Sequence, residues 1–431
     1  MMGWRETGAR RGRWGAALIL ALQSTACTAP DQDQELPAPE ETAEQQPEQA
    51  TVQVGLERLA DGEGDFLQDK RIGLIVHAAS VTAEGHHAID VLRDLDLDVV
   101  RLFSPEHGLR ARAAAGEQVE SGLDPSSGLS VVSLYGSNRK PTPEDLERLD
   151  VLVFDLQGAG VRFYTYVSTM MLCLEAAAEA GLAFVVLDRP NPLGGERVEG
   201  PVSAPRDVVP QSFVNMAPGP LVHGLTLGEM AQYVNTDLDQ PADLTVVPMQ
   251  GWERSMVWAD TGRSWVSPSP NLRSVEAAMA YPGTAFLEAT NVTEGRGTTD
   301  PFLLIGAPWL DPAAIQISVP GFELEPTRFT PESSPAAPKP KYLDQECAGF
   351  RVEITDAAAA EPYRLGVSLV TQLMKQPDFQ WRRDGEALTW LFGTDRLLVD
   401  LLAGKIVDEI VAANSADHAS WRDRRQASLL Y

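Results

Sequence analysis

The sequence has 431 residues and a mass of 46.8 kDa, and its 61 Asp and Glu against 35 Lys and Arg give a formal net charge of −26. This acidic balance excludes nucleic acid as an expected partner, because proteins that bind it need basic side chains to displace the counterions of the phosphates. The three cysteines, Cys27, Cys173 and Cys347, allow at most one disulfide, which excludes a disulfide scaffold. The length predicts two domains or three.

Residues 1–27 have the features of an export signal. Four arginines precede an apolar run at 14–22, which is too short to span a bilayer. The small residues before Cys27 resemble a bacterial lipobox, so we expect Cys27 to be lipidated; an ordinary signal peptide with an incidental cysteine is the alternative. Residues 28–51 contain Pro, Gln and seven acids but no base, which predicts a disordered linker. We therefore expect an exported protein, periplasmic or at the cell surface, whose only membrane contact is this lipid anchor.

The next part of the chain alternates predicted strands and helices. Short apolar runs predict strands at 71–76, 98–103, 131–134, 151–154, 182–187 and 244–247. Helices are predicted at 86–95, after the cap Thr142, at 168–180 before Gly181, and from the capping box of Thr226 and Glu229 to about 234. Such alternation is typical of a parallel sheet with helices on both faces. We therefore predict an α/β fold, with a Rossmann-like doubly wound domain at 52–265.

Residues 266–431 are predicted to form a smaller α+β domain that completes a cleft. Strands are expected at 281–291 and 350–355, and helices at 362–375, 394–403 and 415–428. The proline-rich segment 311–345 is predicted to be a loop. Neither region contains a glycine-rich dinucleotide motif, a P-loop or a His-Glu-x-x-His zinc motif, so we expect no cofactor and no metal.

Polar segments follow three of the predicted strands, those at 98–103, 151–154 and 182–187. Ligands of open α/β sheets bind outside the carboxyl ends of the strands, so these segments are expected to form one site. The side chains predicted to line it are Glu106, His107, Arg110, Glu117, Asp155, Gln157, Arg162, Tyr164, Asp188, Arg189 and Asn191. Carboxylates, hydrogen-bonding groups and aromatic rings together fit carbohydrate recognition.

Several short blocks in a fixed order also carry a family resemblance. They are Phe103-Ser104-Pro105-Glu106-His107-Gly108, Asp155-Leu156-Gln157, Arg162-Phe163-Tyr164-Thr165-Tyr166, Leu187-Asp188-Arg189-Pro190-Asn191-Pro192, His223-Gly224-Leu225-Thr226, Ser269-Pro270-Asn271-Leu272, Tyr281-Pro282-Gly283-Thr284, Glu288-Ala289-Thr290-Asn291 and Glu294-Gly295-Arg296-Gly297-Thr298. Over about 70–431 the sequence resembles the exo-β-N-acetylmuramidase family of peptidoglycan-recycling glycoside hydrolases. The resemblance implies release of N-acetylmuramic acid from the non-reducing end of peptidoglycan fragments, so the expected partner is a peptidoglycan-derived saccharide. His77 and Gly158 depart from the family pattern, which tends to have Asn and Asp there.

Glycoside hydrolysis needs an acid for the leaving oxygen and a second group for the anomeric carbon or water. Glu106, beside Pro105 and close to a strand end, is the predicted general acid/base; a carboxylate that only stabilises its turn is the alternative. His107 either orients Glu106 or is an ordinary loop histidine. Glu117 and Glu294 are the candidates for the second carboxylate, although Glu117 would otherwise be a surface residue and Glu294 a partner of Arg296. Retaining, inverting and substrate-assisted mechanisms all stay open.

Other residues are candidates for binding the substrate. Arg162, Arg189 and Arg296 carry guanidinium groups that match the lactyl carboxylate of the sugar. The remaining candidates are Arg110, Asp155, Gln157, Tyr164, Asp188, Asn191 and His223. Structural alternatives are ion pairs for the aspartates, a buried aromatic pair for Tyr164 and a position near a helix cap for His223.

Two other functions are compatible with parts of this pattern. A non-catalytic sugar-binding lipoprotein would use the same polar cleft. An esterase or amidase would need an activated Ser or Cys, and the sequence contains no Gly-x-Ser-x-Gly elbow.

Overall fold

The structure, a computed structural model, describes residues 51–431, which belong to one compact unit. The predicted export signal, the lipidation site and the linker up to residue 50 lie outside the described residues. Within 51–431, no helix has the length and apolarity needed to cross a membrane. The predicted domain boundary near 265 stays a prediction.

A seven-stranded sheet forms the first part, in the order β3-β4-β2-β1-β5-β6-β9. Its strands are β1 (Arg71–Val76), β2 (Asp98–Ser104), β3 (Gly122–Leu123), β4 (Ser130–Ser133), β5 (Val151–Asp155), β6 (Ala183–Leu187) and β9 (Asp243–Val247). All neighbours are parallel except β3, which pairs antiparallel with β4. The predicted doubly wound α/β fold is therefore confirmed, and strand order reverses between β1 and β5.

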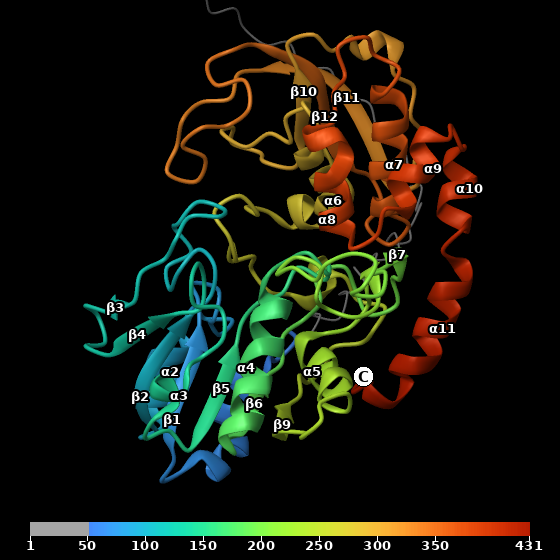
Figure 1. Cartoon of the computed structure of the whole chain (residues 1–431). Coiled ribbons are helices and arrows are strands. Elements are labelled where there is room, and N and C mark those ends of the chain that lie inside the picture. The colour runs from blue at the N-terminus through green and yellow to red at the C-terminus, as the bar shows by residue number, and fades with distance from the viewer. Residues whose placement is uncertain (1–50) are drawn as a thin grey trace, which may run out of the picture. The chain divides into compact units, whose positions relative to one another are not determined.

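Side chains alternate between the two faces of this sheet, as they must along a strand. In β1, Leu74 packs into a cluster with α1 (Gly55–Arg58) and α2 (Ala88–Asp94). Its neighbour Ile75 belongs to the opposite cluster, with α4 (Tyr166–Ala180) and α5 (Leu227–Asn235). Helices thus cover both faces, with α4 and α5 in front of the sheet in Figure 1.

Local signals in the sequence placed several helix ends correctly. Thr142 and Asp145 form a capping box at α3 (Pro143–Leu146), and Thr226 and Glu229 form another at α5. Gly181 ends α4 with φ of +67°, a left-handed conformation that glycine adopts without steric cost.

A three-stranded antiparallel sheet, β10-β12-β11, forms the centre of the second part. The strands are β10 (Leu304–Ala307), β11 (Phe322–Phe329) and β12 (Cys347–Ile354), and a small hairpin of β7 (Glu199–Val202) and β8 (Pro220–Val222) precedes them in the chain. The helices are α6 (Val275–Thr284), α7 (Pro362–Leu373), α8 (Glu386–Phe392), α9 (Arg396–Leu402), α10 (Val407–Ala412) and α11 (Ser415–Arg425). The helices predicted at 362–375, 394–403 and 415–428 and the strand at 350–355 are confirmed.

Two predictions for this part were wrong. Residues 281–291 are not a strand: 275–284 form α6, capped by the Ser274 hydroxyl, and a 3₁₀ helix, η4 (Ala285–Ala289), follows. The helix packs on α7 where Gly283 is so close that a Cβ would lie 2.2 Å from a backbone oxygen of Pro362. The segment 311–345 is not all loop, because β11 pairs with β12 along its full length. Pro326 is tolerated there because β11 is an edge strand.

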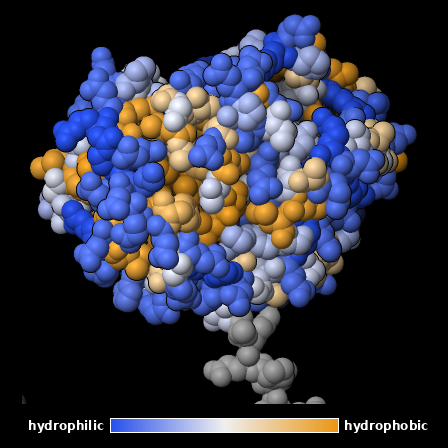
Figure 2. Space-filling view, turned by 90° about the horizontal axis from the view of Figure 1, so that it is seen from below, coloured by the Kyte–Doolittle hydropathy of each residue, from blue (hydrophilic) through white to orange (hydrophobic). Residues whose placement is uncertain are grey.

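One hydrophobic core joins the two parts. It extends from the α4 face of the large sheet to residues of α6, α7 and α8, and includes the fully buried Trp421 of α11. Seen from below, the surface carries mostly hydrophilic side chains with apolar ones exposed between them (Figure 2).

Candidate functional site

A cavity of about 120 Å³ opens beyond the carboxyl end of β2. Residues from both parts of the chain line it: Glu106, His107, Ala115, Phe163, Tyr164, Thr165, Val214, Ser269, Asn271, Leu272, Tyr281, Ala285, Glu288, Arg296, Phe302 and Leu391. Four of the predicted site residues, Glu106, His107, Tyr164 and Arg296, therefore come together here. This is the arrangement expected of a binding site, a concave space lined by apolar and aromatic groups with a few polar ones.

Glu106 is held in the cavity wall by uncharged donors. It lies two residues beyond β2 and is 7% exposed. Its Oε1 accepts a hydrogen bond from the backbone N–H of Gly116 at 3.0 Å, and its Oε2 accepts one from the Thr165 hydroxyl at 2.7 Å. Thr165 precedes α4, so a residue 59 positions away in sequence fixes this carboxylate.

Tyrosines surround the carboxylate. Burial raises the pKa of Tyr164 and of Tyr166 above the usual range, and the negative charge of Glu106 contributes to both shifts. Burial also raises the pKa of Tyr135, and the negative charge of Glu106 adds to the effect. Tyr164 and Tyr166 pack edge to face, with ring centroids 4.7 Å apart. These phenols stay protonated at neutral pH, and the Tyr164 phenol lines the cavity.

His107 shapes the loop after Glu106. Its φ of +71° turns the chain, and its Nδ1 lies 2.8 Å from the carbonyl oxygen of Ala113. Burial lowers the pKa of His107, although the negative charge of Glu106 opposes that shift. The ring is thus a neutral side chain at neutral pH that both lines the cavity and fastens the loop.

The opposite wall contains a charged pair. Arg296 donates to Glu288 Oε1 at 2.6 Å and contacts Glu294 Oε1 at 3.1 Å. Glu294 lies behind Arg296, outside the lining of the cavity, and its Oε2 is 2.9 Å from the Lys341 ammonium. Burial opposes ionisation of Glu294, but Lys341 and Arg296 hold its pKa below the usual value. Glu294 therefore forms the ion pair with Arg296 that the sequence left open as the alternative.

Glu117 and Arg110 lie outside the cavity lining. The Glu117 carboxylate accepts the backbone N–H of Ala114 at 2.7 Å and so closes its own turn. Arg110 is half-exposed and pairs with Asp124 at 3.0 Å. Neither side chain shares the space that Glu106 faces.

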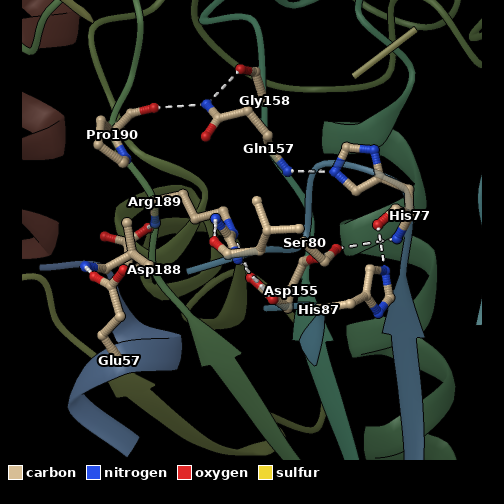
Figure 3. A network of polar contacts seen from close by, with 12 residues as sticks. Glu57, His77, Ser80, His87, Asp155, Gln157, Gly158, Asp188, Arg189 and Pro190 are labelled. Atoms are coloured by element: carbon tan, nitrogen blue, oxygen red, sulfur yellow. Dashed lines mark hydrogen bonds and ion pairs between the residues drawn. The ribbon is translucent and has the colours of Figure 1, made fainter. Parts of the chain in front are cut away.

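The strand ends at the switch point are occupied by their own polar network (Figure 3). Arg189 forms a two-pronged ion pair with Asp155, with Nη2 to Oδ2 at 2.8 Å, and both side chains are buried. The Gln157 side chain donates to the Pro190 carbonyl at 2.8 Å, and its backbone N–H donates to His77 Nε2 at 2.9 Å. These groups hold the strand ends together, and none of them lines the cavity with Glu106.

Three further candidates serve as local supports. Asp188 accepts hydrogen bonds from the Thr226 hydroxyl at 2.7 Å and the Tyr431 hydroxyl at 2.8 Å, and burial raises its pKa to about 6. Asn191 donates to the carbonyl of Leu225 at 3.0 Å. His223 accepts the Leu225 N–H at 3.1 Å, and burial lowers its pKa to about 3.

Arg162 lies in the interior, with no measurable exposure. Its guanidinium donates to the carbonyl oxygens of Pro201 at 3.3 Å, Gly219 at 2.7 Å and Phe392. These partners come from β7, from the turn before β8 and from α8. The side chain thus joins distant segments and does not reach the cavity.

Among the lining residues that sequence reasoning did not select are Thr165, Asn271 and Glu288. Thr165 lies inside a recognised block but is neither charged nor aromatic. Asn271 follows Ser269 and Pro270 in a segment with no predicted element, and Glu288 lies in a segment that was predicted to be a strand. The Asn271 amide donates to the Ala336 carbonyl at 3.0 Å, while its Oδ1 is buried without a hydrogen-bond partner among the described residues.

The fold and the cavity define an α/β enzyme with a carboxylic acid in an aromatic-lined site. Its family is shown by two models, "Exo-beta-N-acetylmuramidase NamZ, N-terminal" over residues 72–276 and "Exo-beta-N-acetylmuramidase NamZ, C-terminal" over residues 279–431. The chain therefore belongs to this family of glycoside hydrolases.

Relatives agree with this assignment. The chain is 38% identical over 388 residues to the peptidoglycan β-N-acetylmuramidase NamZ of Bacillus subtilis (strain 168). The aligned region covers 88% of this chain and 91% of the relative. Two crystal structures of DUF1343 family proteins from Bacteroides fragilis NCTC 9343 match with TM-scores of 0.78 and 0.73. They are 31% and 30% identical, cover 88% and 89% of this chain, and match over 99% of their own length.

Proposed function

We propose that this chain is an exo-acting glycoside hydrolase that releases N-acetylmuramic acid from the non-reducing end of peptidoglycan fragments, with Glu106 as its general acid/base. The family's description and the name of the Bacillus subtilis relative support the substrate and the reaction. The observation that carries the assignment of the acid is the position of Glu106, a buried carboxyl group in a cavity wall with neutral donors around it.

The two donors to Glu106 fix the carboxyl plane without supplying a countercharge. A carboxylate has about four lone-pair positions, and the N–H of Gly116 and the hydroxyl of Thr165 use one on each oxygen. The remaining positions can hold the proton that passes to the glycosidic oxygen. A general acid must be oriented before it can contribute, and this arrangement orients Glu106 from two segments of the chain.

The walls of the cavity offer groups suited to an N-acetylated sugar acid. Tyr164 and Tyr281 present aromatic surface, and the unpaired Oδ1 of Asn271 is an acceptor for a sugar hydroxyl or an acetamido N–H. Arg296 is the cation in the lining that suits the lactyl carboxylate. Because Arg296 already contacts Glu288 and Glu294, it would bind a substrate carboxylate as part of a charged cluster.

The test is hydrolysis of a nitrophenyl β-N-acetylmuramide by the mature protein, compared with the matching N-acetylglucosaminide. We expect release of nitrophenol from the muramide, loss of activity on a natural disaccharide in Glu106→Gln, and a larger KM for the muramide alone in Arg296→Lys. Binding of the sugar without any hydrolysis would refute the proposal and favour a sugar-binding protein. Full activity of Glu106→Gln would refute the assignment of the acid.

We also propose that the protein is exported and anchored through Cys27, because the arginines, the short apolar run and the small residues before Cys27 form the expected signal. Labelling cells with an alkyne fatty acid tests this. The label should appear on the wild-type chain and be lost in Cys27→Ala; an unlabelled wild-type chain in the soluble fraction would refute the anchor.

A further inference from the structure

Glu288 is a second carboxylate in the cavity that contains Glu106. No other Asp or Glu lines this space in residues 51–431, and the sequence-based candidates Glu117 and Glu294 both lie outside it. Glu288 belongs to η4, directly after α6, whereas Glu106 follows β2. The two carboxylates therefore reach one cavity from separate parts of the fold.

Contacts fix the position of Glu288 but leave part of it free. Its backbone carbonyl accepts a hydrogen bond from Arg382 at 3.2 Å, and its Oε1 accepts one from Arg296 at 2.6 Å. Its Oε2 has no hydrogen-bond partner among the described residues, and the side chain is 34% exposed. One oxygen is thus anchored to a cation, while the other faces a space that water can enter.

Tyr281 lines the same cavity as both carboxylates. Its ring lines the cavity, and its pKa is raised by burial and then by the negative charges of Glu288 and, more weakly, Glu106. The hydroxyl therefore lies in the electrostatic field of both groups. The environments of the two carboxylates differ, since Glu106 has only neutral donors and Glu288 has a guanidinium. Unlike surroundings for two carboxyl groups are the usual sign of an acid and a base in one site.

We infer that Glu288 is the catalytic base that activates water in the reaction assigned to Glu106. This inference rests on the proposed function. The proton of Glu106 moves to the glycosidic oxygen as the bond from that oxygen to C1 breaks, and the bonding electron pair stays on the oxygen. Water bonds to C1 from the opposite side and gives a proton to Glu288, and solvent then returns Glu106 and Glu288 to their starting forms. The products are the free sugar, with inverted configuration at C1, and the alcohol of the leaving group.

Two substrates that differ in leaving group distinguish the role of Glu288 as base from the role of Glu106 as acid. Glu288→Gln should lower kcat at least 100-fold on both the nitrophenyl muramide and a natural disaccharide, because water attack is needed for each. Glu106→Gln should lower kcat far less on the nitrophenyl substrate, whose leaving group needs little protonation. Glu346→Gln is the matched control, because it removes a carboxylate from an exposed pair with Arg328 and should leave kcat within twofold.

Two readouts exclude a merely structural effect. Sodium azide should restore turnover to Glu288→Ala and yield a glycosyl azide, since this anion attacks C1 without a base. Proton NMR of the first product of the wild-type protein should show the α-anomer. A kcat of Glu288→Gln within threefold of wild type, a change in KM alone, or release of the β-anomer would overturn the inference. If the wild-type chain hydrolyses neither substrate, the proposed function fails. If the wild-type chain is active and Glu288→Gln keeps that activity, only the inference about Glu288 fails.

Discussion

We expect His223 to make the stability of the fold dependent on pH, and the substitution His223→Asn tests this prediction. The imidazole is buried beneath α11, and its Nδ1 accepts the N–H of Leu225. Its backbone carbonyl accepts bonds from Trp421 and Arg425, each at about 2.8–2.9 Å. In His223→Asn, the amide oxygen can still accept from Leu225, so the variant removes the titrating group and keeps the local hydrogen bond.

The size of the effect follows from the shift in pKa. Burial, with the positive charges of Arg425 and Arg162, lowers the pKa of His223 from 6.5 to about 3. As the pH falls, the unfolded chain therefore takes up a proton before the folded one. The contribution to stability is complete above pH 6.5 and is lost progressively between pH 6.5 and 3. At 1.36 kcal/mol per unit, the loss at pH 4.5 is about 3 kcal/mol.

The assay is urea unfolding at pH 7.5 and pH 4.5, followed by tryptophan fluorescence. Between these pH values, the wild-type protein should lose about 3 kcal/mol more free energy of unfolding than His223→Asn does. His86→Asn, at an exposed histidine, should behave like wild type. Equal losses in wild type and His223→Asn, within about 0.5 kcal/mol, would refute the reasoning.

Three further substitutions distinguish residues that stabilise the fold from residues that act in catalysis or substrate binding. Arg162→Met should lower the free energy of unfolding by about 3 kcal/mol in a urea titration, because three buried carbonyls lose their donor, while KM stays within twofold; a large rise in KM with normal stability would contradict this role. Thr165→Val should lower kcat about tenfold or more through the lost hydrogen bond to Glu106, and Thr165→Ser should recover most of it in the same assay; equal rates for the two variants would count against positioning. Asn271→Leu should raise KM about tenfold for the muramide; it should also lower the melting temperature, because the Ala336 carbonyl loses its donor, and an unchanged KM would exclude contact with the sugar.

Sequence patterns predicted the centre of the large sheet well because β1, β5 and β6 are buried on both faces. Such strands are short continuous apolar runs, and the capping residues between them mark the helices. The second part was harder. The edge strand β11 was not predicted because it contains Pro326, which is unusual in strands. Helix α6 was predicted to be a strand because its helical packing depends on the close approach of Gly283 to α7. That approach is a tertiary contact, which local propensity does not contain.

The site was predicted in part, for a related reason. Strand-end logic located Glu106, since it depends only on where β2 ends. The same logic selected Asp155 and Arg189, but whether such charges face a ligand or each other depends on the distance between residues 34 positions apart in sequence. Glu288 reaches the cavity only because the second part of the chain packs over the first. The periodicity of apolar residues and the spacing of motifs do not predict that packing.

The long-range contacts of α11 and of Tyr431, which follows it, constrain the order of folding. Tyr431 donates its hydroxyl to Asp188, 243 residues earlier in the chain, and Trp421 donates to the carbonyl of His223. A ribosome that has synthesised the whole large sheet has therefore supplied the Thr226 donor to Asp188, but not yet the Tyr431 donor or a cover for His223. Contacts of such sequence separation form slowly, because a long loop must close before they can stabilise anything. Until α11 is in place, the apolar core surface that Trp421 covers is exposed, and exposed surface of this kind promotes aggregation.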